Sequence, residues 1–205
     1  MNKRILLPII SFILGVIAVQ AQQSEYGFRL GLNYSEIDFD DNATGVFGGD
    51  DGARIGFAAG FFAKYYLSEK FSFQPEIQYS SQGEKSEVLN KESVNAPTGA
   101  PLSFDRLNFG VLQLPLLFNY HFTTNFYISA GPQVGILIWE WERAGNYELF
   151  QFSGLGGIGY YINDNLGVDL RAAYGFTDVI KTNTSSTFDA TGVNHYLQLT
   201  LSYRL

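Results

Sequence analysis

Apolar residues recur at every second position along most of the chain, and this period predicts β-strands with one apolar and one polar face. At the end of the chain, the odd positions from Leu197 to Leu205 are apolar or aromatic, and the even positions from Gln198 to Arg204 are polar. The same pattern predicts eight strands in all. Their approximate limits are Tyr26–Ile37, Ala53–Leu67, Phe71–Gly83, Asp105–Phe122, Phe126–Ile138, Leu149–Tyr161, Leu166–Phe176 and His195–Leu205.

The fourth of these strands changes phase part-way along. Phe109 and Val111 share one parity, whereas Leu114 and Leu116 take the other. One extra residue near Gly110–Leu112 would return the apolar side chains to a single face, so we expect a β-bulge there.

The connections between the predicted strands alternate between short and long. The short ones are Ser68–Lys70, Thr123–Asn125 and Ile162–Asn165, and the long, polar ones are Asp38–Gly52, Glu84–Phe104, Trp139–Glu148 and Thr177–Asn194. Short turns facing the periplasm and long loops facing outward are typical of outer-membrane barrels. The sequence therefore predicts an all-β fold: an eight-stranded, antiparallel, up-and-down transmembrane β-barrel with both termini on the periplasmic side.

The first 21 residues have the pattern of a cleaved secretory signal. Lys3 and Arg4 precede an apolar run that is too short to span a bilayer, and the segment ends at Ala21. We therefore expect a signal peptide at residues 1–21, a barrel domain at residues 22–205, and export to the bacterial outer membrane.

Composition narrows the function classes. Removing Lys3 and Arg4 leaves eleven basic residues against twenty acidic ones, so the net charge moves from −7 to −9. Nucleic acid is not an expected partner, because phosphate binding needs clustered cations. The chain has no cysteine, which excludes disulfides and thiolate sites.

Alternation alone does not say which face meets lipid, since a soluble lipocalin-type barrel has its apolar face inside. Here the polar faces carry few charges among many glycines, which suits a narrow interior better than a soluble surface. We expect seven charged side chains in the lumen, mainly with a structural role: Arg29, Arg54, Lys64, Glu76, Asp169, Arg171 and Arg204.

Aromatic residues near the strand ends favour the membrane alternative, because aromatic girdles mark both membrane interfaces. Trp139 and Trp141 fall at the outer rim. The residues expected at the periplasmic rim are Tyr65, Tyr120, Phe122, Phe126, Tyr160 and Tyr203.

Several segments resemble the PorT-like outer-membrane β-barrel family, a porin-family group of small barrels in Bacteroidota. They are FSFQPEIQYSSQG at 71–83, LQLPLLFNY at 112–120, AGP at 130–132, GLGGIGY at 154–160 and RAAYGFTDV at 171–179. The resemblance covers essentially the whole mature chain, and it implies that Pro115 and Pro132 belong inside strands. It departs at the C-terminus, where Leu205 replaces the usual aromatic residue.

An eight-stranded barrel is about wide enough for side chains to fill its interior, so an open pore is not expected. Counting from the Ser68–Lys70 turn places Glu76 opposite Phe62 and diagonal to Lys64, close enough for an ion pair. The alternative is a charge-lined path for an ion or ligand. No cofactor is expected.

Two weaker site patterns occur in the long loops. Asp38, Asp40 and Asn42 have the spacing that opens a calcium-binding EF-hand loop, but the later positions of that motif are missing. The pattern indicates at most a weak metal site in a solvated acidic loop.

His195 could act as the base of a barrel hydrolase, with Ser185, Ser186 and Asp189 in the loop before it. Their spacing matches no catalytic motif. We therefore expect no catalytic residues and no enzyme activity. His121, beside a predicted periplasmic turn, is expected to be an interface or structural residue.

Three functions remain open at this point. The first is a structural or interaction role in the cell envelope, with outer-membrane lipid and envelope proteins as partners. In this role either the four long outer loops meet partners or the periplasmic rim joins an envelope or secretion assembly. The second is a small-solute porin or binding barrel, and the third is a barrel hydrolase. The sequence does not fix the oligomeric state.

Overall fold

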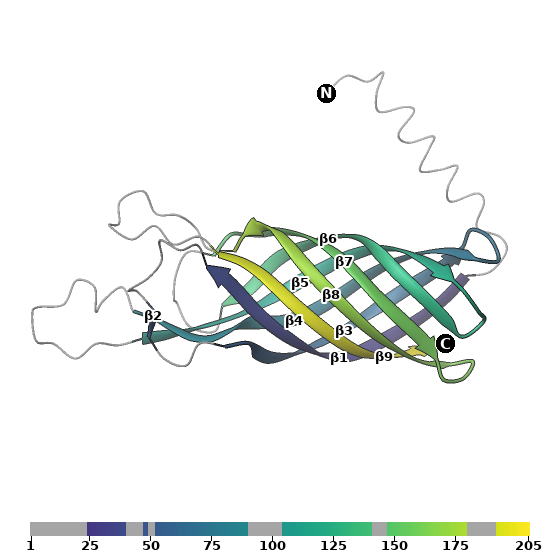
Figure 1. The fold of residues 1–205 in the computed structure, drawn as a ribbon, viewed down its shortest axis with the longest axis horizontal. Helices are drawn as coiled ribbons and strands as arrows, with labels where there is room; N and C mark the ends of the chain where they lie inside the picture. Colours follow the sequence, from purple (N-terminus) through teal and green to yellow (C-terminus); the bar gives the residue numbers. More distant parts are fainter. Residues whose placement is uncertain (1–23, 40–46, 49–51, 90–103, 141–146, 180–191) are drawn as a thin grey trace, which may run out of the picture.

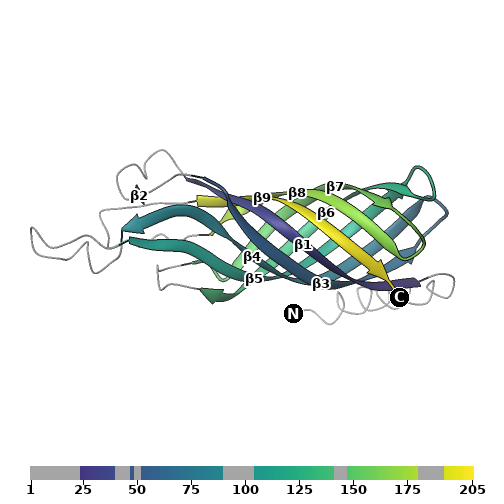
Figure 2. The same cartoon turned by 90° about the horizontal axis from the view of Figure 1, so that it is seen from below.

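The structure, a computed structural model, describes residues 24–39, 47–48, 52–89, 104–140, 147–179 and 192–205 of the chain. These residues form one closed barrel of long, tilted antiparallel strands (Figures 1 and 2). The strands are β1 (Ser24–Phe39), β2 (Phe47–Gly48), β3 (Arg54–Tyr66), β4 (Phe71–Leu89), β5 (Phe104–His121), β6 (Phe126–Glu140), β7 (Phe150–Tyr161), β8 (Leu166–Asp178) and β9 (Gly192–Arg204).

Eight of the strands make the barrel wall in the order β1-β3-β4-β5-β6-β7-β8-β9, and β9 pairs back with β1. β2 is a two-residue strand that pairs only with the outer part of β4, at Glu87 and Val88. Because the ring is closed, each wall strand has a neighbour on both sides, as hydrocarbon requires of a spanning sheet. No helix in the described part of the chain is long and apolar enough to cross a membrane.

The eight predicted strands are confirmed, with ends that coincide or differ by at most six residues. The largest difference is in β4, which continues past the predicted end at Gly83 to Leu89 and pairs there with the start of β5. β2 was not predicted, because a two-residue segment gives no measurable alternation. Pro115 and Pro132 lie inside β5 and β6, as the resemblance implied.

The predicted orientation of the two faces is also confirmed. On β9, Leu197, Leu199 and Leu201 are 50–55% exposed on the outside, whereas Gln198 and Thr200 between them are at most 1% exposed. The outside of the barrel is therefore apolar and the inside is polar. This is the reverse of a soluble barrel, and it suits a wall in contact with lipid.

Three of the aromatic residues expected at the short-turn end, Tyr120, Phe122 and Phe126, pack against one another there. The ring of Tyr120 meets that of Phe122 edge to face, with centroids 4.8 Å apart, and Phe122 packs on Phe126 at 5.7 Å. At the other end, Trp139 is 52% exposed. Trp141, the second tryptophan expected there, lies outside the described residues.

The expectation that a bulge keeps Phe109 and Val111 on the lipid face is wrong. The register between β5 and β6 does shift at Gly110/Val111, but the unpaired residue is Ile138 of β6. As a result, β5 keeps its phase, and Phe109 and Val111 point inward with exposures of 2% and 0%. The apparent phase change in the sequence instead marks a local apolar patch inside the barrel.

Candidate functional site

The centre of the lumen holds a cluster of two arginines and two carboxylates, from strands β1, β4 and β8. Arg171 donates from both terminal nitrogens to Glu76, at 2.9 and 3.0 Å, and lies 3.4 Å from Asp169. Arg29 pairs with Glu76 and, at 3.0 Å, with Asp169. All four side chains are at most 2% exposed. Each charge therefore has opposite charges as neighbours, which offsets the cost of removing it from water.

The position of these strands means that the cluster links opposite walls of the barrel. In a ring of eight strands β4 and β8 stand four places apart, so they are on opposite walls. The two bonds from Arg171 to Glu76 therefore span the full width of the lumen. A second cross-link joins Lys64 of β3 to Tyr161 of β7, which are again four places apart.

The predicted pair between Lys64 and Glu76 is not formed. The register is as predicted, with Phe62 opposite Glu76, but Glu76 is taken by the two arginines. The Lys64 ammonium instead donates to the Tyr161 hydroxyl and lies over the rings of Tyr127 and Tyr161, 4.4 and 4.7 Å from their centroids. Aromatic faces attract a cation at this distance, so Lys64 has favourable partners without a carboxylate.

The lumen beyond the cluster, toward the long-loop end, is filled by amide and hydroxyl side chains. Gln78 bonds to its direct neighbour Gln113 on the adjacent strand at 2.8 Å, and Tyr196 of β9 reaches Gln133 of β6, three strands away, at 3.0 Å. A cavity of about 10 Å³ remains among these side chains, which is enough for about one water molecule.

At the long-loop end, the lumen contains a small apolar cluster. Its members are Ile37, Phe109, Val111, Tyr147 and Val179, all at most 5% exposed, with Leu137 packed against them. Arg54, one of the seven predicted lumen charges, lies near this end and donates to the Ser81 hydroxyl and the Gln82 carbonyl. The described lumen is thus filled by charged, polar and apolar side chains, with a second buried apolar group, Leu117, Leu155, Ala173 and Tyr196, packed beside the polar ones.

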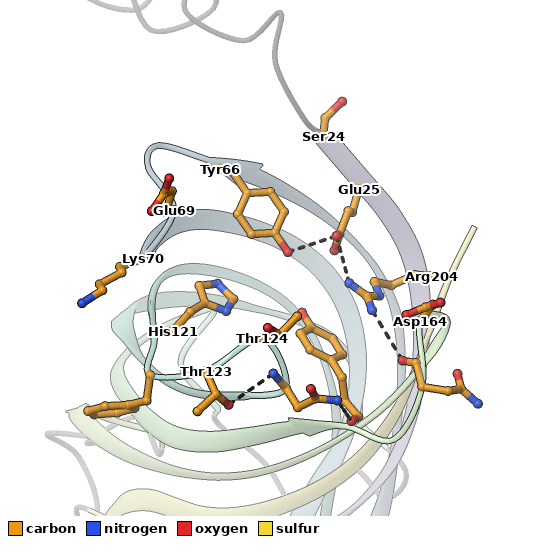
Figure 3. A pocket seen from close by; sticks show the side chains of 14 residues that line it. Ser24, Glu25, Tyr66, Glu69, Lys70, His121, Thr123, Thr124, Asp164 and Arg204 are labelled. Carbon is orange, nitrogen blue, oxygen red and sulfur yellow. Dashed lines mark hydrogen bonds and ion pairs between the residues drawn. The ribbon is translucent and has the colours of Figure 1, made fainter.

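At the short-turn end, the lumen opens into a cup of about 680 Å³ (Figure 3). Glu25 accepts hydrogen bonds from Arg204 at 2.9 Å and from the Tyr66 hydroxyl at 3.0 Å, and the Arg204 guanidinium lies 3.9 Å from the Tyr161 ring centroid. His121 packs between Tyr66 and Tyr127, with ring centroids 5.5 and 5.4 Å apart. These rings separate the cup from the charge cluster, so the cup is closed at its inner end.

The rim of the cup carries exposed polar side chains from all three short turns. They include Glu69 and Lys70 of the first turn, Thr123 and Thr124 of the second, and Asn163 and Asp164 of the third. By the rule that short turns of such barrels face the periplasm, this rim is the periplasmic face of the protein.

The sequence of residues 20–181 matches the family described as outer membrane protein beta-barrel domain. The chain belongs to this family. Its fold and its family together place it in the bacterial outer membrane, with the apolar outer surface in lipid and the short-turn end in the periplasm. No curated protein matches the chain in sequence.

Several solved outer-membrane proteins have a similar fold. Neisserial surface protein A (NspA) gives a TM-score of 0.52 at 11% identity, over 90% of this chain and 100% of that one. Ail, the attachment invasion locus protein of Yersinia pestis, gives a TM-score of 0.47 at 14% identity, over 90% of this chain and 100% of that one. OprG of Pseudomonas aeruginosa gives a TM-score of 0.43 at 13% identity, over 89% of this chain and 94% of that one. At these identities, the similarity to NspA shows the fold alone.

The candidate calcium ligands are not brought together in the described part of the chain. Asp38 is exposed at the end of β1, where it pairs with Val193, and Asp40 and Asn42 lie outside the described residues. The described residues contain no group of three or more potential metal ligands.

His195, the candidate base, points away from the lumen. Its ring stacks on Tyr174 on the outer surface, with centroids 4.2 Å apart, and its Nδ1 accepts a hydrogen bond from the Gly175 amide at 3.3 Å. Ser185, Ser186 and Asp189 lie outside the described residues. A hydrolytic site at His195 would therefore have to form on the outer wall, at the lipid boundary.

Two features of the lumen were missed in the sequence. One is the inward apolar cluster around Phe109. The other is the set of tyrosines, Tyr127, Tyr161 and Tyr196, which point inward and make hydrogen bonds across the lumen. Strand parity could have placed these tyrosines inside, since Tyr127 shares its parity with Ser129. Their partners lie on strands far apart in the sequence, and parity gives no distance across the lumen.

Proposed function

We propose that this protein has a structural or interaction role in the cell envelope, performed at its periplasmic end by a barrel whose lumen does not conduct. The observation that carries the proposal is the bidentate Arg171–Glu76 pair, which joins opposite walls at 2.9 and 3.0 Å. A solute would have to break this pair, the Arg29 contacts and the Lys64–Tyr161 bond, and so leave buried charges without partners.

The cup at the periplasmic end supports an interaction role. Its volume lies within the range of sites that bind small ligands, and its rim offers carboxylate, amide, hydroxyl and ammonium groups within one concave surface. We propose further that this role is linked to secretion or envelope assembly. A partner in the periplasm would therefore meet a site that the barrel holds fixed at the membrane surface.

Conductance in planar bilayers tests whether the lumen is closed. The folded barrel should give no stable open current, while β-sheet circular dichroism of the same proteoliposomes shows that it has inserted. A stable current from the unaltered protein would contradict the proposal and favour the alternative, a small-solute porin.

Photo-crosslinking in intact cells tests the interaction role. A photoreactive residue at Thr124, on the rim of the cup, should form adducts with one envelope protein, and the same residue at Leu197, on the lipid-facing wall, should not. Equal protein adducts at both positions, or adducts at neither, would contradict a dedicated periplasmic contact.

A further inference from the structure

The lipid-facing wall has an open hollow of about 580 Å³ on the side formed by β1, β3, β4 and β5. On β9, by contrast, large leucine side chains project outward. The side chains around the hollow are Phe28, Leu30, Phe61, Ile77, Tyr79 and Leu112.

The hollow exists because of Ala59. Along β3, the neighbouring outward residues are Phe57 and Phe61, which are 55% and 67% exposed. Across the sheet, Ala59 pairs with Leu30 of β1 and Tyr79 of β4. A single methyl group is thus surrounded on four sides by large side chains, and the backbone at this point lies open to the membrane.

The walls of the hollow are apolar and held in place. The ring of Tyr79 packs on Phe57 with centroids 5.3 Å apart. Arg29 and Gln78 also border the hollow, but each is only 1% exposed because its side chain points into the lumen. An occupant would therefore meet almost entirely aliphatic and aromatic surface, with no exposed charge to recognise.

We propose that this hollow holds one acyl chain of an outer-membrane lipid for longer than the rest of the wall does. In a bilayer the surroundings are as apolar as the protein, so retention depends on close packing, not on the hydrophobic effect. A flexible alkyl chain can follow the walls around Ala59, whereas a convex part of the wall touches a chain on one side only. The inference is independent of whether the lumen conducts.

Ala172 on β8 provides a matched control. Like Ala59, it is an alanine that points outward, and it lies between Leu170 and Tyr174 along its strand. Across the sheet it pairs with Leu197 on one side, but with Gly156 on the other. That side is open, so Ala172 is not enclosed as Ala59 is.

Native mass spectrometry of the full-length barrel, released from vesicles of a single phosphatidylethanolamine, measures lipid retention. The unaltered protein and the Ala172→Leu variant should each keep one lipid after mild delipidation, and Ala59→Leu, which fills the hollow, should lose it. Equal retention by all three proteins would overturn the proposal. A dimer that Ala59→Leu alone dissociates would overturn it as well, since the occupant would then be a second copy of the chain.

A second measurement does not depend on a variant. With alanine methyl groups labelled with ¹³C, the Ala59 methyl should show stronger nuclear Overhauser effects to lipid chain methylenes than the Ala172 methyl does. Equal effects at the two methyls would overturn the proposal even if Ala59→Leu failed to fold.

Discussion

The ring of Tyr127 lies directly against Gly159, its partner on the neighbouring strand. A Cβ atom added at Gly159 would be 2.1 Å from Cζ of the ring, which no real contact allows. Glycine at this position lets Tyr127 lean across β7 and donate a hydrogen bond of 2.5 Å to Asp169 on β8. The space at Gly159 thus lets Tyr127 contact both His121, which lines the cup, and Asp169 of the charge cluster.

Gly159→Ala should therefore lower the free energy of unfolding by about 1–3 kcal/mol, the usual cost of overpacking. Gly156→Ala is the matched control on the same strand, because a Cβ there meets nothing within 4 Å. Urea titrations of the folded barrels in vesicles measure both values. Equal effects of the two substitutions would show that Tyr127 does not need the space at Gly159.

Glu76→Gln should be far more damaging than Glu25→Gln. At position 76 it leaves Arg29 and Arg171 with Asp169 as their remaining charged partner in the buried cluster, and removing one partner of a buried pair costs about 3–5 kcal/mol. Glu25 and Arg204 are 26% and 15% exposed, so their pair contributes about 1 kcal/mol or less. The same urea titrations compare the two variants, and similar losses would argue against an essential central cluster.

Lys64→Met should cost about 1 kcal/mol or less, because the neighbours of Lys64 are two aromatic rings and one hydroxyl, and methionine packs well on rings. Arg171→Met should cost about 3–5 kcal/mol, since it leaves two carboxylates short of a partner. A loss at Lys64 as large as that at Arg171 would mean that the charge of Lys64, and not its packing, is what the barrel needs.

The apolar cluster and the polar part of the lumen should respond oppositely to swaps between valine and threonine. Val111→Thr puts a hydroxyl among apolar side chains and should cost about 1–3 kcal/mol. Thr200→Val should be neutral or stabilising, because the buried Thr200 hydroxyl has no hydrogen-bond partner among the described residues. Thermal unfolding followed by circular dichroism measures both, and a loss at Thr200 equal to that at Val111 would contradict this division of the lumen.

The alternation in the sequence predicts the strand number because it is a pattern within each single strand. The lipid-facing side follows from the composition of the two faces, and the barrel from the alternating lengths of the connections. The register of Phe62 with Glu76 was predicted correctly, since a short turn fixes it. The partner of Glu76 was not. Arg171 reaches it across the lumen from a strand 95 residues away, and that meeting depends on barrel width and stagger, which no local pattern contains.

The apparent phase change in β5 led to a wrong prediction about which way side chains point. Phe109 and Val111 are apolar, so a rule that places every apolar residue in lipid moves them outward. In the structure they are buried with Ile37 of β1 and Val179, the residue after β8, and such a cluster of distant residues cannot be seen in the alternation. The sequence did locate the irregularity at Gly110–Leu112, but not the strand that bulges.

The central claim is that side chains block the lumen between its two ends. Because the chain has no cysteine, single cysteines can report on access to a membrane-impermeant thiol reagent. Thr124→Cys on the rim of the cup should react fully, whereas Ser80→Cys, at a lumen position that is 0% exposed, should not react over the same time with reagent on both sides of the membrane. Reaction at Ser80→Cys as fast as at Thr124→Cys would mean that the lumen is open.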